Sequence, residues 1–133
     1  MPKQLTIIDT LSDPGKEGRP NEDRLGHNAY SAFVLDGATG LGDRQFMDGF
    51  GSDAAWIAQF AAKRLINELS FDTHVTELIR AIAFDAHELF TATAGEKTRS
   101  FWPLSAPAAL RLPPGGREFH CLGARVFSLA HVF

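Results

Sequence analysis

Two long stretches of the chain repeat their apolar residues with a period near 3.6, which is typical of amphipathic helices. The first is predicted to run from Ala54 to about Ser70, with Ser52 or Asp53 as its N-cap residue. The second is predicted over residues 73–91. Its apolar stripe consists of Val75, Leu78, Ile79, Ile82, Ala86, Leu89 and Phe90. Trp56 and Phe60 recur at helical spacing in the first helix, so we interpret both as core residues.

Shorter apolar segments that are rich in β-branched and aromatic residues predict strands. They occupy residues 5–11, 33–35, 107–112, 118–122 and 125–130. A Pro-Pro-Gly-Gly turn separates the strand at 107–112 from the strand at 118–122. Two long helices packed side by side on a sheet give an α+β fold.

Composition and charge indicate the number of domains, the kind of partner and the cellular compartment to expect. The 133 residues suit a single domain over residues 1–133, and 44% hydrophobic content with eleven Phe is ample for one core. A net charge of −3 gives no indication of nucleic acid or an anionic membrane as a partner. The single cysteine, Cys121, cannot form an internal disulfide and is expected to be a buried thiol in a reducing compartment. With no signal-peptide core and no membrane-spanning run, we expect a cytoplasmic protein.

Acidic residues gather around one strand end. The segment at residues 33–40 is an apolar run that ends abruptly in Asp36, followed by Gly37, which can leave its own carbonyl unshielded. Upstream, Glu22 and Asp23 place two further carboxylates side by side. Three acids that converge from two strand ends make an all-oxygen site for a hard divalent cation.

Each part of this pattern also has a plain structural interpretation. Asp-Gly at 36–37 suits a type I′ hairpin turn, and neighbouring acids such as Glu22 and Asp23 are often solvated surface residues. Asp43 and Asp48 could extend the acidic site, although loop aspartates usually cap helices or stabilise turns. The combination and order of the motifs favour the metal site.

Three motifs carry a resemblance to a known family. Residues 19–23 read Arg-Pro-Asn-Glu-Asp, residues 36–40 read Asp-Gly-Ala-Thr-Gly after an apolar strand, and residues 51–56 read Gly-Ser-Asp-Ala-Ala-Trp at a helix start. In this order they resemble the N-terminal signature of PPM-type (type 2C) metal-dependent serine/threonine phosphatases, in a bacterial form. The resemblance covers roughly residues 4–95. It implies a partial αββα-type sandwich, with antiparallel sheets and a pair of long antiparallel helices on one face.

The resemblance also implies a role for each site residue. Asp36 would bridge two Mn²⁺ or Mg²⁺ ions, the Gly37 carbonyl and Glu22 would hold one of them, and Asp23 would be a direct or near-shell ligand. Arg19 would orient the phosphate of a phosphoserine or phosphothreonine protein, although it stands one residue closer to Glu22 than the commonest family spacing. The two ions would activate a water for attack on phosphorus.

The second half of the family pattern is missing. The family holds its other ion with aspartates from the C-terminal half, whereas this chain has no Asp after Asp85 and reads Gly-Ala-Arg at 123–125 where Gly-Asp-x-Arg would stand. We therefore expect a truncated or frame-disrupted member with one ion at most, weak or no activity, and self-association through exposed sheet surface. The alternatives are a non-catalytic metal-binding or protein-interaction module derived from that fold, and a small α+β domain whose Asp-Gly is only a turn.

Overall fold

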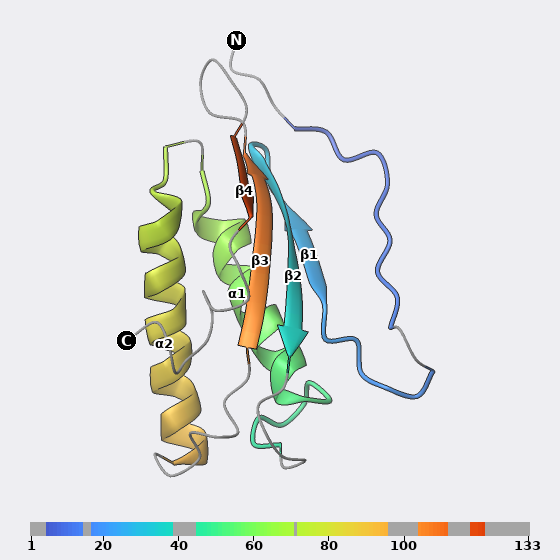
Figure 1. The fold of residues 1–133 in the computed structure, drawn as a ribbon, viewed down its shortest axis with the longest axis vertical. Helices are drawn as coiled ribbons and strands as arrows, with labels where there is room; N and C mark the ends of the chain where they lie inside the picture. Colours follow the sequence, from blue (N-terminus) through green and yellow to red (C-terminus); the bar gives the residue numbers. More distant parts are fainter. Residues whose placement is uncertain are drawn as a thin grey trace.

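The computed structural model describes residues 5–14, 17–38, 45–70, 72–95, 104–111 and 118–121 (Figure 1). Its elements, in chain order, are β1 (Arg24–His27), β2 (Ser31–Ala38), α1 (Asp53–Glu68), α2 (Val75–Ala94), β3 (Leu104–Arg111) and β4 (Glu118–Cys121). The predictions of both long helices, and of strands near 107–112 and 118–122, are confirmed. The predicted turn at 113–116 and the predicted strand at 125–130 lie outside the described residues.

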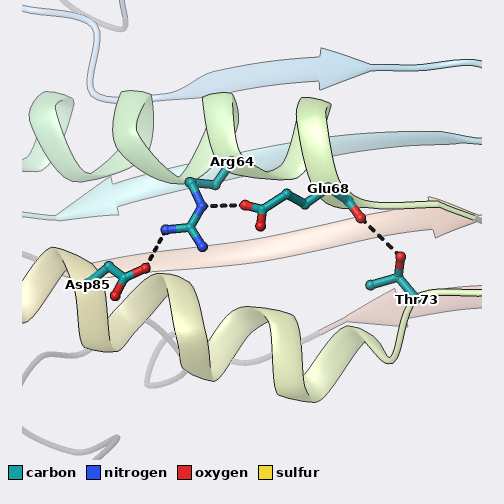
Figure 2. Close-up of polar contacts among 4 residues, drawn as sticks. All are labelled: Arg64, Glu68, Thr73 and Asp85. Atoms are coloured by element: carbon teal, nitrogen blue, oxygen red, sulfur yellow. Dashed lines mark hydrogen bonds and ion pairs between the residues drawn. The ribbon is translucent and has the colours of Figure 1, made fainter.

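The described strands form one antiparallel sheet in the order β1-β2-β3-β4. Both helices lie on the same face of this sheet (Figure 1). The two helices run antiparallel, since the C-terminal end of α1 lies beside the N-terminal approach to α2 (Figure 2). This architecture confirms the expected α+β fold with an antiparallel sheet and a pair of helices packed on it.

The core lies between the sheet and the helices. Along β2, Phe33 and Leu35 point into it and are 3% and 1% exposed, whereas Val34 between them is 56% exposed. This alternation follows from the period of two along a strand. The helices contribute a core cluster of Ala58, Ala61, Ala62, Leu65, Leu69, Val75, Leu78, Ile79, Ile82 and Ala83. The alanines of α1 are small, so this helix can approach the sheet closely.

A second apolar cluster joins the start of α1 to the end of α2. Trp56 lies 5.8 Å from Phe90 and 5.7 Å from Phe60 between ring centroids, and Phe46 meets Phe90 edge-on at 5.8 Å. Aromatic pairs at these separations add to the area that they bury. The interpretation of Trp56 and Phe60 as packing residues is confirmed, with Phe60 only partly buried.

Polar contacts cap the start of α1 and join the two helices. Ser52 is the N-cap of α1, and its side chain accepts a hydrogen bond from the Ala55 amide. Arg64 of α1 pairs with Glu68 on its own helix and with Asp85 of α2, at 2.6 Å for Asp85 (Figure 2). These side chains are partly solvated, so the ion pairs contribute modestly to stability.

In the described part of the chain, no helix has the length and apolarity that crossing a membrane requires.

Two sequence predictions about this framework are wrong. Residues 5–11 form no strand, and Ile8 and Leu11 are 96% and 87% exposed. Local β-propensity cannot tell whether a partner edge will be in register, which explains this error. Leu89 was assigned to the buried stripe of α2 but is 44% exposed. One residue step turns a helix by about 100°, so Leu89 lies on the flank of buried Phe90.

Substitution of a core position on α2 tests this arrangement. Ile82→Ala should lower the free energy of unfolding by roughly 2–5 kcal/mol, because Ile82 is fully buried between both helices and the sheet. Leu89→Ala on the same helix should cost less than about 1 kcal/mol. Urea denaturation measures both values, and equal losses would contradict the described packing.

Candidate functional site

The register of β1 and β2 brings two of the predicted acids together. Arg24 pairs with Leu35 across the antiparallel ladder, and the same register continued by one residue sets Asp23 opposite Asp36. Directly opposed residues on an antiparallel pair point to the same face. The Asp23 carboxyl lies close enough to raise the pKa of the Asp36 carboxyl, after the larger effect of partial burial. The predicted convergence of these two side chains is therefore present.

The turn between β1 and β2 fixes this register. The Asn28 side-chain oxygen accepts hydrogen bonds from the Tyr30 amide at 3.0 Å and from the Ser31 amide at 3.0 Å. The Asn28 side-chain amide donates to the Leu69 carbonyl at 2.6 Å, just beyond α1. Asparagine suits such a turn because its side chain mimics a backbone partner. The hairpin is thereby attached to the helical layer.

The turn interpretation of Asp36-Gly37 is wrong. Both residues lie inside β2, which continues to Ala38, and the chain reverses at residues 28–30 instead. Our expectation that the strand ends at Leu35 is corrected by the same observation. Asp36 is exposed on the open face of the sheet, opposite to the face that carries Phe33 and Leu35.

Gly37 has a role that its sequence context did not reveal. A Cβ atom at this position would lie 2.5 Å from the Glu22 carbonyl oxygen and 2.7 Å from the Ala54 carbonyl oxygen. No side chain fits at such distances, so glycine lets three backbone segments meet here. These segments are β2, the residues before β1 and the first turn of α1. The expected role of the Gly37 carbonyl as a metal ligand stays a prediction.

All five predicted site residues line one hollow of about 380 Å³. Its lining consists of Pro14, Arg19, Pro20, Asn21, Glu22, Asp23, Asp36 and Gly37. A second hollow of about 560 Å³ shares Asp23 and Asp36 with the first and extends over Leu25 and Val34 on the open face of the sheet. Asp48, considered as an extension of the site, is exposed and lines neither hollow, and Asp43 lies outside the described residues.

The electrostatics of the hollow disfavour the ionised form of Asp36. Partial burial raises the pKa of the Asp36 carboxyl above its usual value, and the charge of Asp23, the hydrogen bond to Asp23 and the charge of Glu22 raise it further. Like charges directly opposite each other on an antiparallel pair destabilise the sheet. A proton or a cation between the carboxylates removes this repulsion.

The donor set suits a hard divalent cation in its chemistry. Carboxylate and carbonyl oxygens are the ligands that Mg²⁺ and Mn²⁺ prefer, and Mg²⁺ is commonly held by one or two carboxylates with water completing its shell. Among the side chains that the structure describes, no group of three or more His, Cys, Asp or Glu residues is arranged so that it could hold a metal ion. The site therefore offers the pair Asp23 and Asp36, with Glu22 beside them in the same hollow.

Two further residues near the site were not singled out in the sequence. The Arg24 guanidinium donates to the Asn21 and Asp23 carbonyls and to the Gln59 side chain. Gln59 lies 35 residues away in α1, and no local pattern singles it out. Asp53, in contrast, is 1% exposed and accepts hydrogen bonds from the Phe46 and Met47 amides, so its role is structural.

Neutralising Asp36 should stabilise the metal-free protein. Its pKa is higher in the folded chain than in the unfolded chain, so the folded state binds this proton more tightly and loses stability as the pH rises through the folded pKa. Asp36→Asn should therefore raise the melting temperature in chelator at neutral pH. The gain in melting temperature should vanish below about pH 4, where the Asp36 carboxyl is protonated and, like the amide that replaces it, carries no charge.

Asp48→Asn is the matched control, because it removes the same charge from an exposed loop position away from the hollows. A gain of equal size from Asp48→Asn, or a loss of stability from Asp36→Asn at neutral pH, would contradict the repulsion described above.

Comparison with known proteins adds no relative: no family model, no curated protein and no solved structure matches the chain significantly. The resemblance to PPM-type phosphatases therefore rests on the three sequence motifs. The grouping of Arg19, Glu22, Asp23, Asp36 and Gly37 around one hollow is an independent structural observation.

Proposed function

We propose that this protein binds one Mg²⁺ or Mn²⁺ ion through Asp36, Asp23, Glu22 and the Gly37 carbonyl, and that it is a PPM-type serine/threonine phosphatase-like domain with weak phosphomonoesterase activity. The observation that supports this proposal most strongly is the opposed pair Asp23 and Asp36, with the raised pKa of Asp36. A like-charge pair in a surface hollow costs stability, and perturbed carboxyl groups in hollows are frequent at functional sites.

Arg19 supports the choice of a phosphate ester as the substrate class. Its exposed side chain lines the same hollow as the acids, so a cation and a guanidinium would face one bound group. A guanidinium fork matches two phosphate oxygens, which makes arginine the residue of choice for such contacts. In this proposal Arg19 orients the phosphate, and the acids hold the cation.

A divalent cation at this site would polarise the phosphoryl oxygens and lower the pKa of a nearby water. The residues of the chain then have separate tasks. Asp23 and Asp36 would hold the ion, and Glu22 would add negative charge from the side of the hollow. Residues 86–133 include no Asp, so the proposal names ligands for one ion only.

The runner-up proposal is a non-catalytic metal-binding or protein-interaction module. One observation favours the protein-interaction module: Val34 is 56% exposed and leaves apolar surface on the open face of the sheet. In the phosphatase proposal the partner is a protein that carries phosphoserine or phosphothreonine, and in the module proposal it is a second copy of this chain on that face. We propose the cytoplasm as its location, since a lone cysteine suits a reducing compartment.

Metal-dependent stability and turnover decide between these functions. With Mn²⁺ at 100 times its dissociation constant, the wild-type protein should gain about 2.7 kcal/mol of stability, because the ion binds only the folded state. It should also hydrolyse an aryl phosphate slowly. Asp36→Ala should abolish both effects, and Asp48→Ala should leave both intact.

The outcomes of this experiment separate the three hypotheses. Stabilisation with turnover supports the phosphatase, stabilisation without turnover supports the binding module, and neither effect leaves a small α+β domain with no metal function. Activity that persists at the wild-type level in Asp36→Ala would refute the proposed site.

Loss of Arg19 should impair the substrate and not the ion. Arg19→Ala should lower kcat/KM for an aryl phosphate by roughly 10- to 100-fold, the range expected for loss of a charge-assisted hydrogen bond. The Mn²⁺-dependent rise in melting temperature should be unchanged, because Arg19 cannot ligate a cation. If Arg19→Ala abolishes the Mn²⁺-dependent rise in melting temperature but spares kcat/KM, this division of roles is contradicted.

A further inference from the structure

Arg24 joins the site to the helical layer through three hydrogen bonds. Its Nε donates to the Gln59 side-chain oxygen at 2.9 Å, and one terminal nitrogen donates to the Asn21 carbonyl at 2.6 Å and to the Asp23 carbonyl at 2.7 Å. Gln59 lies in α1 between Ala58 and Phe60, in the part of the helix that packs on the sheet. The guanidinium therefore links a rigid helix to the short segment that carries the paired acids.

The position of these bonds in the chain matters. The Asn21 carbonyl lies one residue before Glu22 and the Asp23 carbonyl one residue after it, so Arg24 restrains the backbone on both sides of Glu22. The Asn21 side chain accepts a further bond from the Asp23 amide at 3.0 Å. We call residues 21–23 the acid turn. Its main chain is thus held from within by Asn21 and from outside by Arg24.

We propose that Arg24, anchored on Gln59, is a positioning residue that holds the acid turn so that Asp23 faces Asp36 and Glu22 lines the same hollow. Arg24 donates to carbonyl oxygens rather than to carboxylates, so all three acids remain available to a cation. The consequence for cation binding rests on the proposed function, whereas the positioning of Asp23 against Asp36 can be tested without any metal.

The geometry requires arginine and not merely a positive charge. Arg24 uses two of its nitrogens in one plane to reach a side chain of α1 and two main-chain carbonyls. A lysine ammonium keeps the charge but is a point donor on a flexible stem, so it cannot reproduce this planar fork. Arg24→Lys therefore separates positioning from simple charge compensation.

The first experiment is a double-mutant cycle on the metal-free protein. Asp23→Asn and Asp36→Asn relieve the same repulsion, so their effects on the melting temperature should be clearly non-additive in the wild-type background. In the Arg24→Lys background the same cycle should be close to additive, because the acid turn no longer holds Asp23 against Asp36. Unchanged non-additivity in Arg24→Lys would overturn the proposal.

Two variants control this cycle. Arg80→Lys makes the same substitution at an exposed position of α2 and should leave the coupling at its wild-type value. Gln59→Met retains Arg24 and removes only its anchor on α1. It should therefore lower the coupling between Asp23 and Asp36, as Arg24→Lys does. If Arg24→Lys fails to fold, the result with Gln59→Met decides, and full coupling in Gln59→Met overturns the role of the anchor.

The second experiment measures the consequence for cation binding. The Mn²⁺ concentration that gives half of the maximal rise in melting temperature should increase about tenfold in Arg24→Lys, as is usual when a residue that orients metal ligands is lost. An unchanged concentration would overturn the link to the cation. If the wild-type protein shows no Mn²⁺-dependent rise in melting temperature, the proposed function fails, and so does the link from Arg24 to the cation. The metal-free cycle then still tests the positioning role.

Discussion

The antiparallel register between β1 and β2 is the constraint on which the candidate site depends. It places Arg24 opposite Leu35, and by continuation Asp23 opposite Asp36. A slip of one residue would turn Asp36 toward the helices and Phe33 toward solvent, because side chains alternate between the faces of a sheet. The burial of Phe33 and Leu35 therefore specifies the position of an exposed carboxylate.

The same constraint sets two requirements against each other. The core favours a tightly packed hairpin. The apolar face of β2 and the turn at Asn28 provide it. On the open face, that hairpin places two acids opposite each other, and partial burial followed by the charge of Asp23 raises the pKa of Asp36. The surrounding structure keeps the two acids opposite each other in spite of this cost. Here the surrounding structure is the buried face of β2 and the glycine contact at position 37.

Backbone contacts, more than side-chain contacts, bring the acid turn to the sheet. The Glu22 carbonyl oxygen lies against Gly37, and the carbonyls on either side of Glu22 accept from Arg24. This arrangement leaves the carboxylates directed toward the hollow while the main chain is immobilised. The site is assembled from residues of the hairpin, yet it also depends on α1. The Ala54 carbonyl lies against Gly37, and the Gln59 side chain accepts a hydrogen bond from Arg24.

The sequence by itself determined the helices, a strand at residues 33–35 and the set of acids that gather at one end of the hairpin. These features follow from local periodicity and from short motifs, which act over a few residues. The sequence did not determine that residues 5–11 would form no strand, that Asp36 would lie inside β2, or that Leu89 would be exposed. Only the tertiary structure decided these points and the link from Arg24 to Gln59, because each depends on which distant surface a residue meets when the sheet and helices pack together.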